Sequence, residues 1–200
     1  MHSSRFLIAR ILKPSVLLGA GMISCISAHQ ARAGDCTSLA NIHLPATEIT
    51  VAKAVPAGQF TPPKGDAVAV KAFCRVAAVS TPAPDSHIEF EAWLPLANWN
   101  GKFEGIGNGG FAGSIDYGRL ADAVEHGYAA ASTNTGHDAG GADASWALHH
   151  PEKITDFGYR AIHLTNLNAK SLVRAFYGSA PKRSYFSACS NGGRQALMEA

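Results

Sequence analysis

The alternation of apolar and polar residues predicts the first strands of this chain. Residues 87–94 alternate with a period of two, which is typical of a half-buried antiparallel strand. One face carries Ile88, Phe90, Ala92 and Leu94, and the opposite face carries His87, Glu89, Glu91 and Trp93. Residues 67–79 are apolar at nearly every second position and predict another strand. Residues 34–63 contain four prolines and predict an irregular segment that wraps around the domain.

The second half of the chain alternates strands with helices. Helical spacing predicts a helix over 116–126 with Gly127 at its end. A short apolar strand over 128–132 is expected to follow, and such strands are typical of parallel sheets that are buried on both faces. Asp156 is the expected N-cap of a long helix that runs to Tyr177. A strand over 184–188 leads into a final helix from Arg194. Antiparallel strands followed by alternating strands and helices predict a three-layer α/β fold.

The first 33 residues have the organisation of an export signal. Positive charges near the start precede an apolar stretch over 16–28, and Ala31-Arg32-Ala33 is a typical cleavage site. We therefore expect a signal peptide over 1–33, cleavage after Ala33, and a secreted or periplasmic mature chain. A lipoprotein signal ending at Cys25 is the alternative, although Met22-Ile23-Ser24 matches that pattern poorly.

Composition and charge narrow the classes of partner. Hydrophobic residues make up 46% of the chain and charged residues 16%, as in a globular domain, and residues 34–200 are expected to form part of one such domain. The net charge is +2 and the basic residues are scattered, so no nucleic-acid partner is expected. No segment beyond the signal has the pattern of a membrane span.

Export leaves three cysteines, Cys36, Cys74 and Cys189, and exported cysteines tend to pair. A Cys36–Cys74 bond would tie the mature N-terminus to a later strand. Cys189 is then either a buried free thiol or the partner of a cysteine beyond residue 200.

The residues around Ser190 have the pattern of a nucleophile elbow. A strand-prone run precedes Ser190 and a helix-prone run follows it. The elbow turns so sharply that the residues two before and two after the serine must be small, and those places hold Ala188 and Gly192. The N-terminus of the following helix favours negative charge near Ser190. The pattern therefore predicts a nucleophilic serine, against the simpler interpretation of a serine in an ordinary turn.

The sequence disfavours two other chemistries. A thiol phosphatase built on Cys189 needs an arginine six residues later, where this chain has Gln195. The stretch 105–110 matches the G-x-G-x-x-G fingerprint of dinucleotide-binding proteins. That fingerprint requires a helix that begins within the glycines, and residues 111–115 have no helical pattern.

Several motifs together resemble the tannase and feruloyl esterase family of α/β-hydrolases. The matching segments, in order along the chain, are Gly107–Gly113 (GNGGFAG), Thr135–Asp138 (TGHD), Asp143–Leu148 (DASWAL), Asp156–Arg160 (DFGYR) and Cys189–Gln195 (CSNGGRQ). The resemblance extends from about Cys36 to the end of the chain and implies the α/β-hydrolase fold.

The resemblance implies roles for individual residues. Ser190 would be the nucleophile, and the backbone N–H groups of Gly110 and Asn191 would form the oxyanion hole. Cys36 would pair with Cys74, and Cys189 with a cysteine adjacent to the catalytic histidine. Family members are longer than this chain, and their catalytic Asp and His and a lid with a calcium site follow the elbow. The chain is therefore expected to be an N-terminal portion that is inactive and poorly folded alone.

The expected activity is hydrolysis of aromatic esters of the feruloyl, galloyl or terephthalate type through an acyl-enzyme on Ser190, with no cofactor in the chemistry. The alternative is a non-catalytic exported module that binds aromatic ligands. The histidines before the elbow are not expected to replace the missing base: His137 is predicted to be structural or to face substrate, His149 and His150 to lie in a surface loop, and His163 in a helix. Asp156 and Arg160 are predicted to hold their helix.

Overall fold

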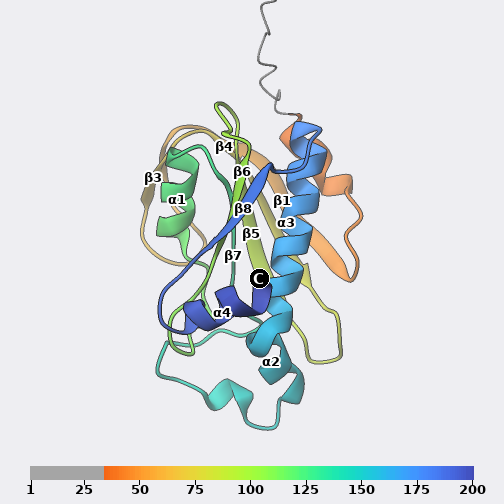
Figure 1. The fold of residues 1–200 in the computed structure, drawn as a ribbon, viewed down its shortest axis with the longest axis vertical. Helices are drawn as coiled ribbons and strands as arrows, with labels where there is room; N and C mark the ends of the chain where they lie inside the picture. Colours follow the sequence, from red (N-terminus) through yellow and green to blue (C-terminus); the bar gives the residue numbers. More distant parts are fainter. Residues whose placement is uncertain (1–33) are drawn as a thin grey trace, which may run out of the picture.

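A computed structural model describes residues 34–200 as a mixed six-stranded sheet between two helical layers (Figure 1). The signal peptide and Cys25 lie outside the described residues. The strands of the sheet are β1 (Thr47–Val55), β4 (Phe73–Ser80), β5 (Ile88–Pro95), β6 (Lys102–Ile106), β7 (Ala129–Thr133) and β8 (Arg183–Ser187). Their order is β1-β4-β5-β7-β6-β8. The first three strands pair antiparallel, whereas β6 pairs parallel with both β7 and β8. This is the predicted α/β class.

Helices cover both faces of the sheet, because the connections between its parallel strands cross the sheet on opposite sides. Helix α1 (Tyr117–Glu125) joins β6 to β7, and the long helix α3 (Ala161–Tyr177) joins β7 to β8. Buried side chains alternate along β7 accordingly: Ala129 and Ala131 belong to the core under α3, and Ala130 to the core under α1. The remaining helical segments are η1 (Cys36–Asn41), η2 (Ser145–Ala147), α2 (Pro151–Thr155), η3 (Asp156–Arg160) and α4 (Asn191–Glu199). Within 34–200 no helix has the length and apolar character needed to cross a membrane.

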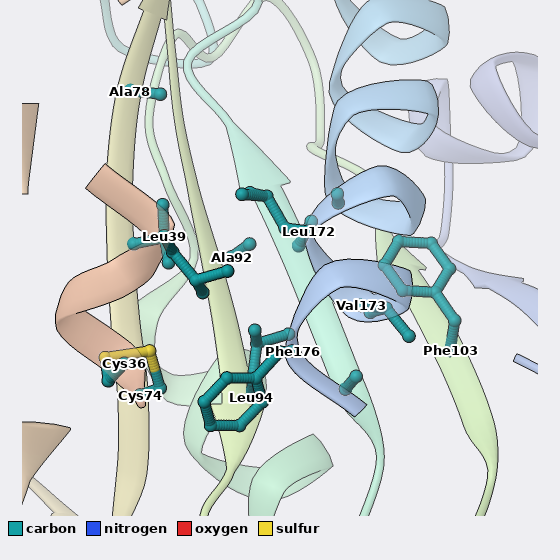
Figure 2. Packing of buried hydrophobic residues seen from close by; sticks show 14 of the residues in the cluster. Cys36, Leu39, Cys74, Ala78, Ala92, Leu94, Phe103, Leu172, Val173 and Phe176 are labelled. Atoms are coloured by element: carbon teal, nitrogen blue, oxygen red, sulfur yellow. A yellow bond between two sulfur atoms is a disulfide. The ribbon is translucent and has the colours of Figure 1, made fainter. Parts of the chain in front are cut away.

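The core under α3 is the larger of the two. Figure 2 shows Leu172, Val173 and Phe176 of α3 directed toward the sheet, where Leu94 and Phe103 lie. All five are buried, with at most 2% of their surface exposed. At roughly 2 kcal/mol for each fully buried large apolar side chain, this contact is a main source of the stability of the sheet.

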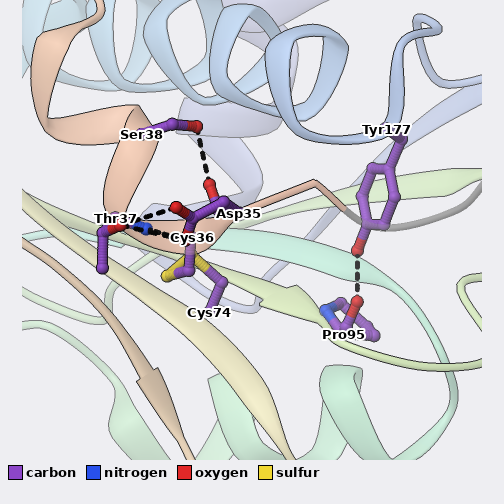
Figure 3. Close-up of a disulfide and its surroundings, with 7 residues drawn as sticks. All are labelled: Asp35, Cys36, Thr37, Ser38, Cys74, Pro95 and Tyr177. Carbon is purple, nitrogen blue, oxygen red and sulfur yellow. Dashed lines mark hydrogen bonds between the residues drawn. A yellow bond between two sulfur atoms is a disulfide. The ribbon is translucent and has the colours of Figure 1, made fainter.

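A disulfide ties the N-terminal segment to the sheet beside this core. Cys36 in η1 bonds to Cys74 in β4, with the two Cα atoms 5.5 Å apart (Figure 3). The Asp35 carboxylate caps η1 by accepting the N–H of Thr37 at 3.0 Å. Crosslinks of this kind typically stabilise small exported domains by about 2–4 kcal/mol. The pairing is the one that the family resemblance implied.

Three expectations for the first hundred residues were wrong. The segment 34–63 is not irregular throughout, because it contains β1 and the short strand β2 (Gly58–Phe60). The single strand expected over 67–79 is divided into β3 (Val68–Val70), which pairs with β2, and β4. The strand over 87–94 is correct, but it is not half-buried: Glu91 and Trp93, on its predicted polar face, are 2% and 0% exposed. They lie on the face that α1 and the β2–β3 hairpin cover.

The second half also departs from expectation at the start of two helices. The final helix, α4, begins at Asn191 and not at Arg194. The long helix begins at Pro151, so Asp156 is not its N-cap but opens the π-helical turn η3. The Asp156 carboxylate accepts a hydrogen bond from Arg160 Nε at 2.5 Å, which confirms that these two residues hold the helix.

Candidate active site

Three loops meet at one edge of the sheet because β6, β7 and β8 are parallel and end at the same edge. After β6 comes the glycine loop, residues 107–113; after β7 comes the loop 134–144; after β8 comes the turn 188–190. Backbone hydrogen bonds join the loops: Gly107 N–H donates to Ser187 O at 3.2 Å, and Phe111 N–H donates to Gly141 O at 2.9 Å. Ligand sites of α/β proteins lie at this edge, at the carboxyl ends of the strands.

Ser190 has a strained backbone at the corner between β8 and α4. Its φ and ψ are 58° and −123°, and α4 begins at the next residue. A non-glycine residue in such a conformation costs about 1–3 kcal/mol, and strain of this kind gathers at functional sites. The residue is exposed, so the turn presents its hydroxyl to solvent. This is the corner geometry that the sequence predicted.

Small neighbours make the corner possible. A Cβ on Gly192 would lie 2.3 Å from the Cβ of Ala188 and 3.0 Å from the backbone oxygen of Asn108. A Cβ on Gly193 would meet nothing within 4 Å. The glycine required by the turn is therefore Gly192, as predicted, and Gly193 is not needed for space.

These two glycines make a matched pair of variants. We expect Gly192→Ala to lower the free energy of unfolding by about 2 kcal/mol, because the added methyl group overpacks the corner. We expect Gly193→Ala to raise it by about 0.5 kcal/mol, because alanine loses less backbone entropy in a helix. Urea unfolding of the protein expressed from its complete natural gene, called the complete protein below, measures both. Equal effects at the two positions would contradict this account of the corner.

The two N–H groups predicted to bind an oxyanion are free of protein acceptors. Within residues 34–200, neither the N–H of Asn191 nor that of Gly110 donates a hydrogen bond to a protein group. Asn191 is the first residue of α4, where N–H groups lack intrahelical partners and the helix dipole favours negative charge. Gly110 has a φ of +57°, and a Cβ there would lie 2.4 Å from Gly141 O, so the loop path requires glycine. The oxyanion role itself stays a prediction.

A cavity of about 940 Å³ adjoins this corner. The elbow contributes Cys189 and Ser190 to its wall, and the glycine loop contributes residues 107–109. Tyr117 of α1 and Pro62 of the β2–β3 connection supply apolar surface. An exposed serine on the wall of a large, partly apolar cavity can meet an organic substrate there.

The comparisons with known proteins agree with this geometry. The family model described as "Tannase and feruloyl esterase" matches residues 74–200. The chain belongs to this family. An uncharacterized esterase of Xanthomonas campestris pv. campestris is 49% identical over 166 residues, which are 82% of this chain and 29% of that protein. A probable feruloyl esterase B-2 of Aspergillus terreus is 35% identical over 195 residues, which are 93% of this chain and 36% of that protein.

A solved structure extends the likeness to three dimensions. The crystal structure of feruloyl esterase B from Aspergillus oryzae superposes with a TM-score of 0.73 at 36% identity, over 80% of this chain and 32% of that one. The chain therefore spans about a third of the length of the tannase-family relatives that it matches.

The structure contradicts the dinucleotide-binding interpretation. That fingerprint needs a helix that starts within the glycines. In this tannase-family chain Gly105 and Ile106 end β6, and α1 begins only at Tyr117, seven residues after Gly110. The glycines instead form the loop that packs against the elbow.

Cys189 lies on the cavity wall beside Ser190. It is exposed and, among the described residues, is not in a disulfide. The expectation that it could be a buried free thiol is therefore wrong. Its pairing with a cysteine near the catalytic histidine, as the family resemblance implies, stays a prediction.

Two histidines before the elbow, His137 and His150, are held in structural contacts. His137 is 5% exposed; its Nε2 lies 2.8 Å from Phe111 O, and its ring stacks on Trp146 at 3.8 Å between centroids. His150 Nδ1 lies 2.8 Å from an Asp85 carboxylate oxygen on the surface. His163 belongs to α3, as predicted. His137 thus joins the loop 134–144 to the glycine loop, as the structural one of its two expected roles requires.

The described residues do not fit the calcium that the family resemblance implies. Between residues 34 and 200, no three His, Cys, Asp or Glu side chains gather as metal ligands. The expected calcium site on a lid therefore stays a prediction about another part of the protein.

Sequence reasoning gave no role to two residues of α4 that hold the site together. Arg194 donates to the backbone oxygens of Phe157, at 2.9 Å, and Gly158 in the π-helical turn, and to Asn191 Oδ1 at 2.8 Å. Burial lowers the pKa of this guanidinium. Gln195 is 1% exposed and binds Asn108 of the glycine loop. Both belong to the CSNGGRQ motif, so the available signal was their place in that motif, four and five residues after Ser190.

Proposed function

We propose that the complete protein is an exported serine esterase that hydrolyses aromatic carboxylic esters through an acyl-enzyme on Ser190. The observation that carries this proposal is the strained, exposed Ser190 on a cavity wall, together with the N–H groups of Asn191 and Gly110, which have no protein acceptors among residues 34–200. Strain and unpaired donors both cost stability, and a catalytic site is where such costs have a use.

The chemistry follows from these groups. Ser190 Oγ attacks the ester carbonyl carbon while its proton passes to a histidine base. The carbonyl oxygen becomes an oxyanion, which the N–H groups of Gly110 and Asn191 stabilise. The alcohol leaves with the proton from the histidine, and water then attacks the acyl-enzyme in the same way to release the acid. The histidine and its supporting aspartate are proposed to follow Ala200, as the Ser-Asp-His order of α/β-hydrolases implies.

The proposed substrates are esters of aromatic acids such as ferulic or gallic acid. The matched relatives include feruloyl esterases, and their family includes tannases. In this chain the cavity offers Tyr117, Ile115 and Pro62 as apolar surface for an aromatic ring. Export is proposed from the signal pattern over 1–33, and the Cys36–Cys74 disulfide fits an oxidising compartment.

The experiment that tests this function uses the complete protein and a fluorophosphonate probe. A fluorophosphonate forms a stable adduct only with an activated serine, so we expect one equivalent of label on the peptide that contains Ser190. Hydrolysis of methyl ferulate and methyl gallate, followed by release of the free acid, measures turnover. Binding of these esters without labelling or turnover would instead support the non-catalytic aromatic-binding module.

A further inference from the structure

We infer that Gln195 is a positioning residue that locks the glycine loop in register with the nucleophile elbow through Asn108. The inference rests on the proposed function, because it assigns a task within the same site. It concerns a buried amide pair that the proposed chemistry does not itself use.

The two amides satisfy each other in a reciprocal pair. The backbone N–H of Asn108 donates to Gln195 Oε1 at 2.9 Å, and Gln195 Nε2 donates to Asn108 Oδ1 at 3.1 Å. The exposed fractions are 1% for Gln195 and 8% for Asn108. Hydrogen bonds in such a buried position matter because a polar group left there without a partner carries its full desolvation penalty.

The pair joins three elements at the site. The Asn108 side-chain nitrogen also donates to Thr133 O at the end of β7, at 2.8 Å, and to Ser114 O beyond the glycine loop, at 2.7 Å. Gln195 belongs to α4, five residues after Ser190. One buried side chain thus links the helix that begins directly after the nucleophile to the loop that carries Gly110, two residues after Asn108.

The glycine loop is shaped to admit Gln195. A Cβ on Gly107 would lie 2.5 Å from Gln195 Oε1 and 2.8 Å from the Cβ of Ala188. Any side chain at position 107 would therefore push both the amide and the elbow away. Because Gly107 has no side chain, α4 lies close enough to the loop for Gln195 to bind the backbone of Asn108.

The clamp, which is the hydrogen-bonded pair of Asn108 and Gln195, would serve catalysis by holding the oxyanion donors in position. The N–H groups of Gly110 and Asn191 come from different segments, and both must point at one oxygen atom in the transition state. Gln195 fixes the separation of those segments without touching the cavity itself. A misplacement of about 1 Å can cost about 10²-fold in rate. Because the clamp acts on the oxyanion and not on the ground-state ester, its loss should lower kcat more than it raises KM.

The test compares Gln195→Met with Ala196→Gly in the complete protein. Methionine keeps the volume of the side chain but loses both hydrogen bonds, so we expect kcat to fall about 10²-fold with KM within about twofold of the wild-type value. Ala196→Gly loosens α4 without touching the glycine loop and should leave kcat nearly unchanged. A wild-type kcat in Gln195→Met, or an equal loss in Ala196→Gly, would overturn the inference.

A second measurement does not depend on activity. Amide hydrogen exchange of Asn108 is expected to be slow in the wild-type protein and at least about tenfold faster in Gln195→Met, because the N–H loses its acceptor. Unchanged exchange would also overturn the inference. A wild-type protein that does not react with the fluorophosphonate would instead count against the proposed function. Failure of the inference and failure of the proposed function can therefore be told apart.

Discussion

Replacing Ser190 with alanine is expected to lower kcat of the complete protein by about 10⁶-fold, the largest effect that any single substitution in this chain should have. Without the hydroxyl no acyl-enzyme forms, and only substrate binding and the oxyanion donors remain to assist attack by water. The N–H groups of Gly110 and Asn191 are backbone groups and survive the substitution. A small residual rate, due to substrate binding and these two donors, is therefore compatible with the proposal.

The controls for this variant come from the same strand and the same turn. Ser184→Ala removes an exposed serine from β8 and should leave turnover at the wild-type level. Ser190→Gly should be as inactive as Ser190→Ala, yet it should raise the free energy of unfolding by about 1 kcal/mol, because glycine tolerates the positive φ. Initial rates on methyl ferulate and urea unfolding give both quantities. Substantial turnover by Ser190→Ala would exclude the acyl-enzyme.

Local sequence signals determined much of the fold around this serine. The short alanine-rich run before Asn134 became the buried strand β7, and Asp116 caps α1 by accepting the N–H of Arg119 at 3.0 Å. The corner at Ser190 was predictable because its steric rule acts within five residues, from Ala188 to Gly192. Each of these features depends on neighbours in the sequence.

Features that depend on distant partners could not be predicted in this way. Strand β1 lies in a segment of irregular appearance and is held by its pairing with β4, where Val55 lies opposite Phe73. The π-helical turn η3 differs from an α-helix by a single inserted residue, and its carbonyl groups find a donor in Arg194, thirty-six residues after Gly158. The clamp between Asn108 and Gln195 likewise joins residues that are eighty-seven positions apart.

The surroundings of Glu91, on the face of the sheet that α1 covers, also depend on distant partners and could not be predicted. Alternation placed it on a polar face, since a period of two does not reveal whether the second face is covered. The structure covers that face and supplies partners. Arg75 donates to both carboxylate oxygens of Glu91, at 2.9 Å to Oε2, and Trp93 Nε1 donates to Oε2 at 2.8 Å. Tyr117 Oη lies 3.3 Å from Oε1 and can donate to it.

Removing this carboxylate is expected to have the largest effect on stability. Glu91→Leu should lower the free energy of unfolding by about 4 kcal/mol, because it leaves the buried Arg75 guanidinium without a counter-charge. In the wild-type protein the hydrogen bond with Glu91 raises the pKa of Arg75. A guanidinium does not lose its proton in proteins even without such a partner, so Arg75 of the variant cannot escape the cost by becoming neutral. Urea unfolding of the complete protein, followed by the fluorescence of its tryptophans, gives the free energy.

Two further variants separate charge from packing. The double variant Arg75→Met with Glu91→Leu should recover at least about half of the loss, because apolar residues of similar volume can replace a buried ion pair. Glu125→Gln breaks the exposed Lys71–Glu125 pair, whose side chains are 57% exposed each, and should cost under about 1 kcal/mol. If the double variant were no more stable than Glu91→Leu, lost packing and not the uncompensated charge would be the cause. The side chains of the buried pair would then stabilise the sheet mainly by filling the space between α1 and β5.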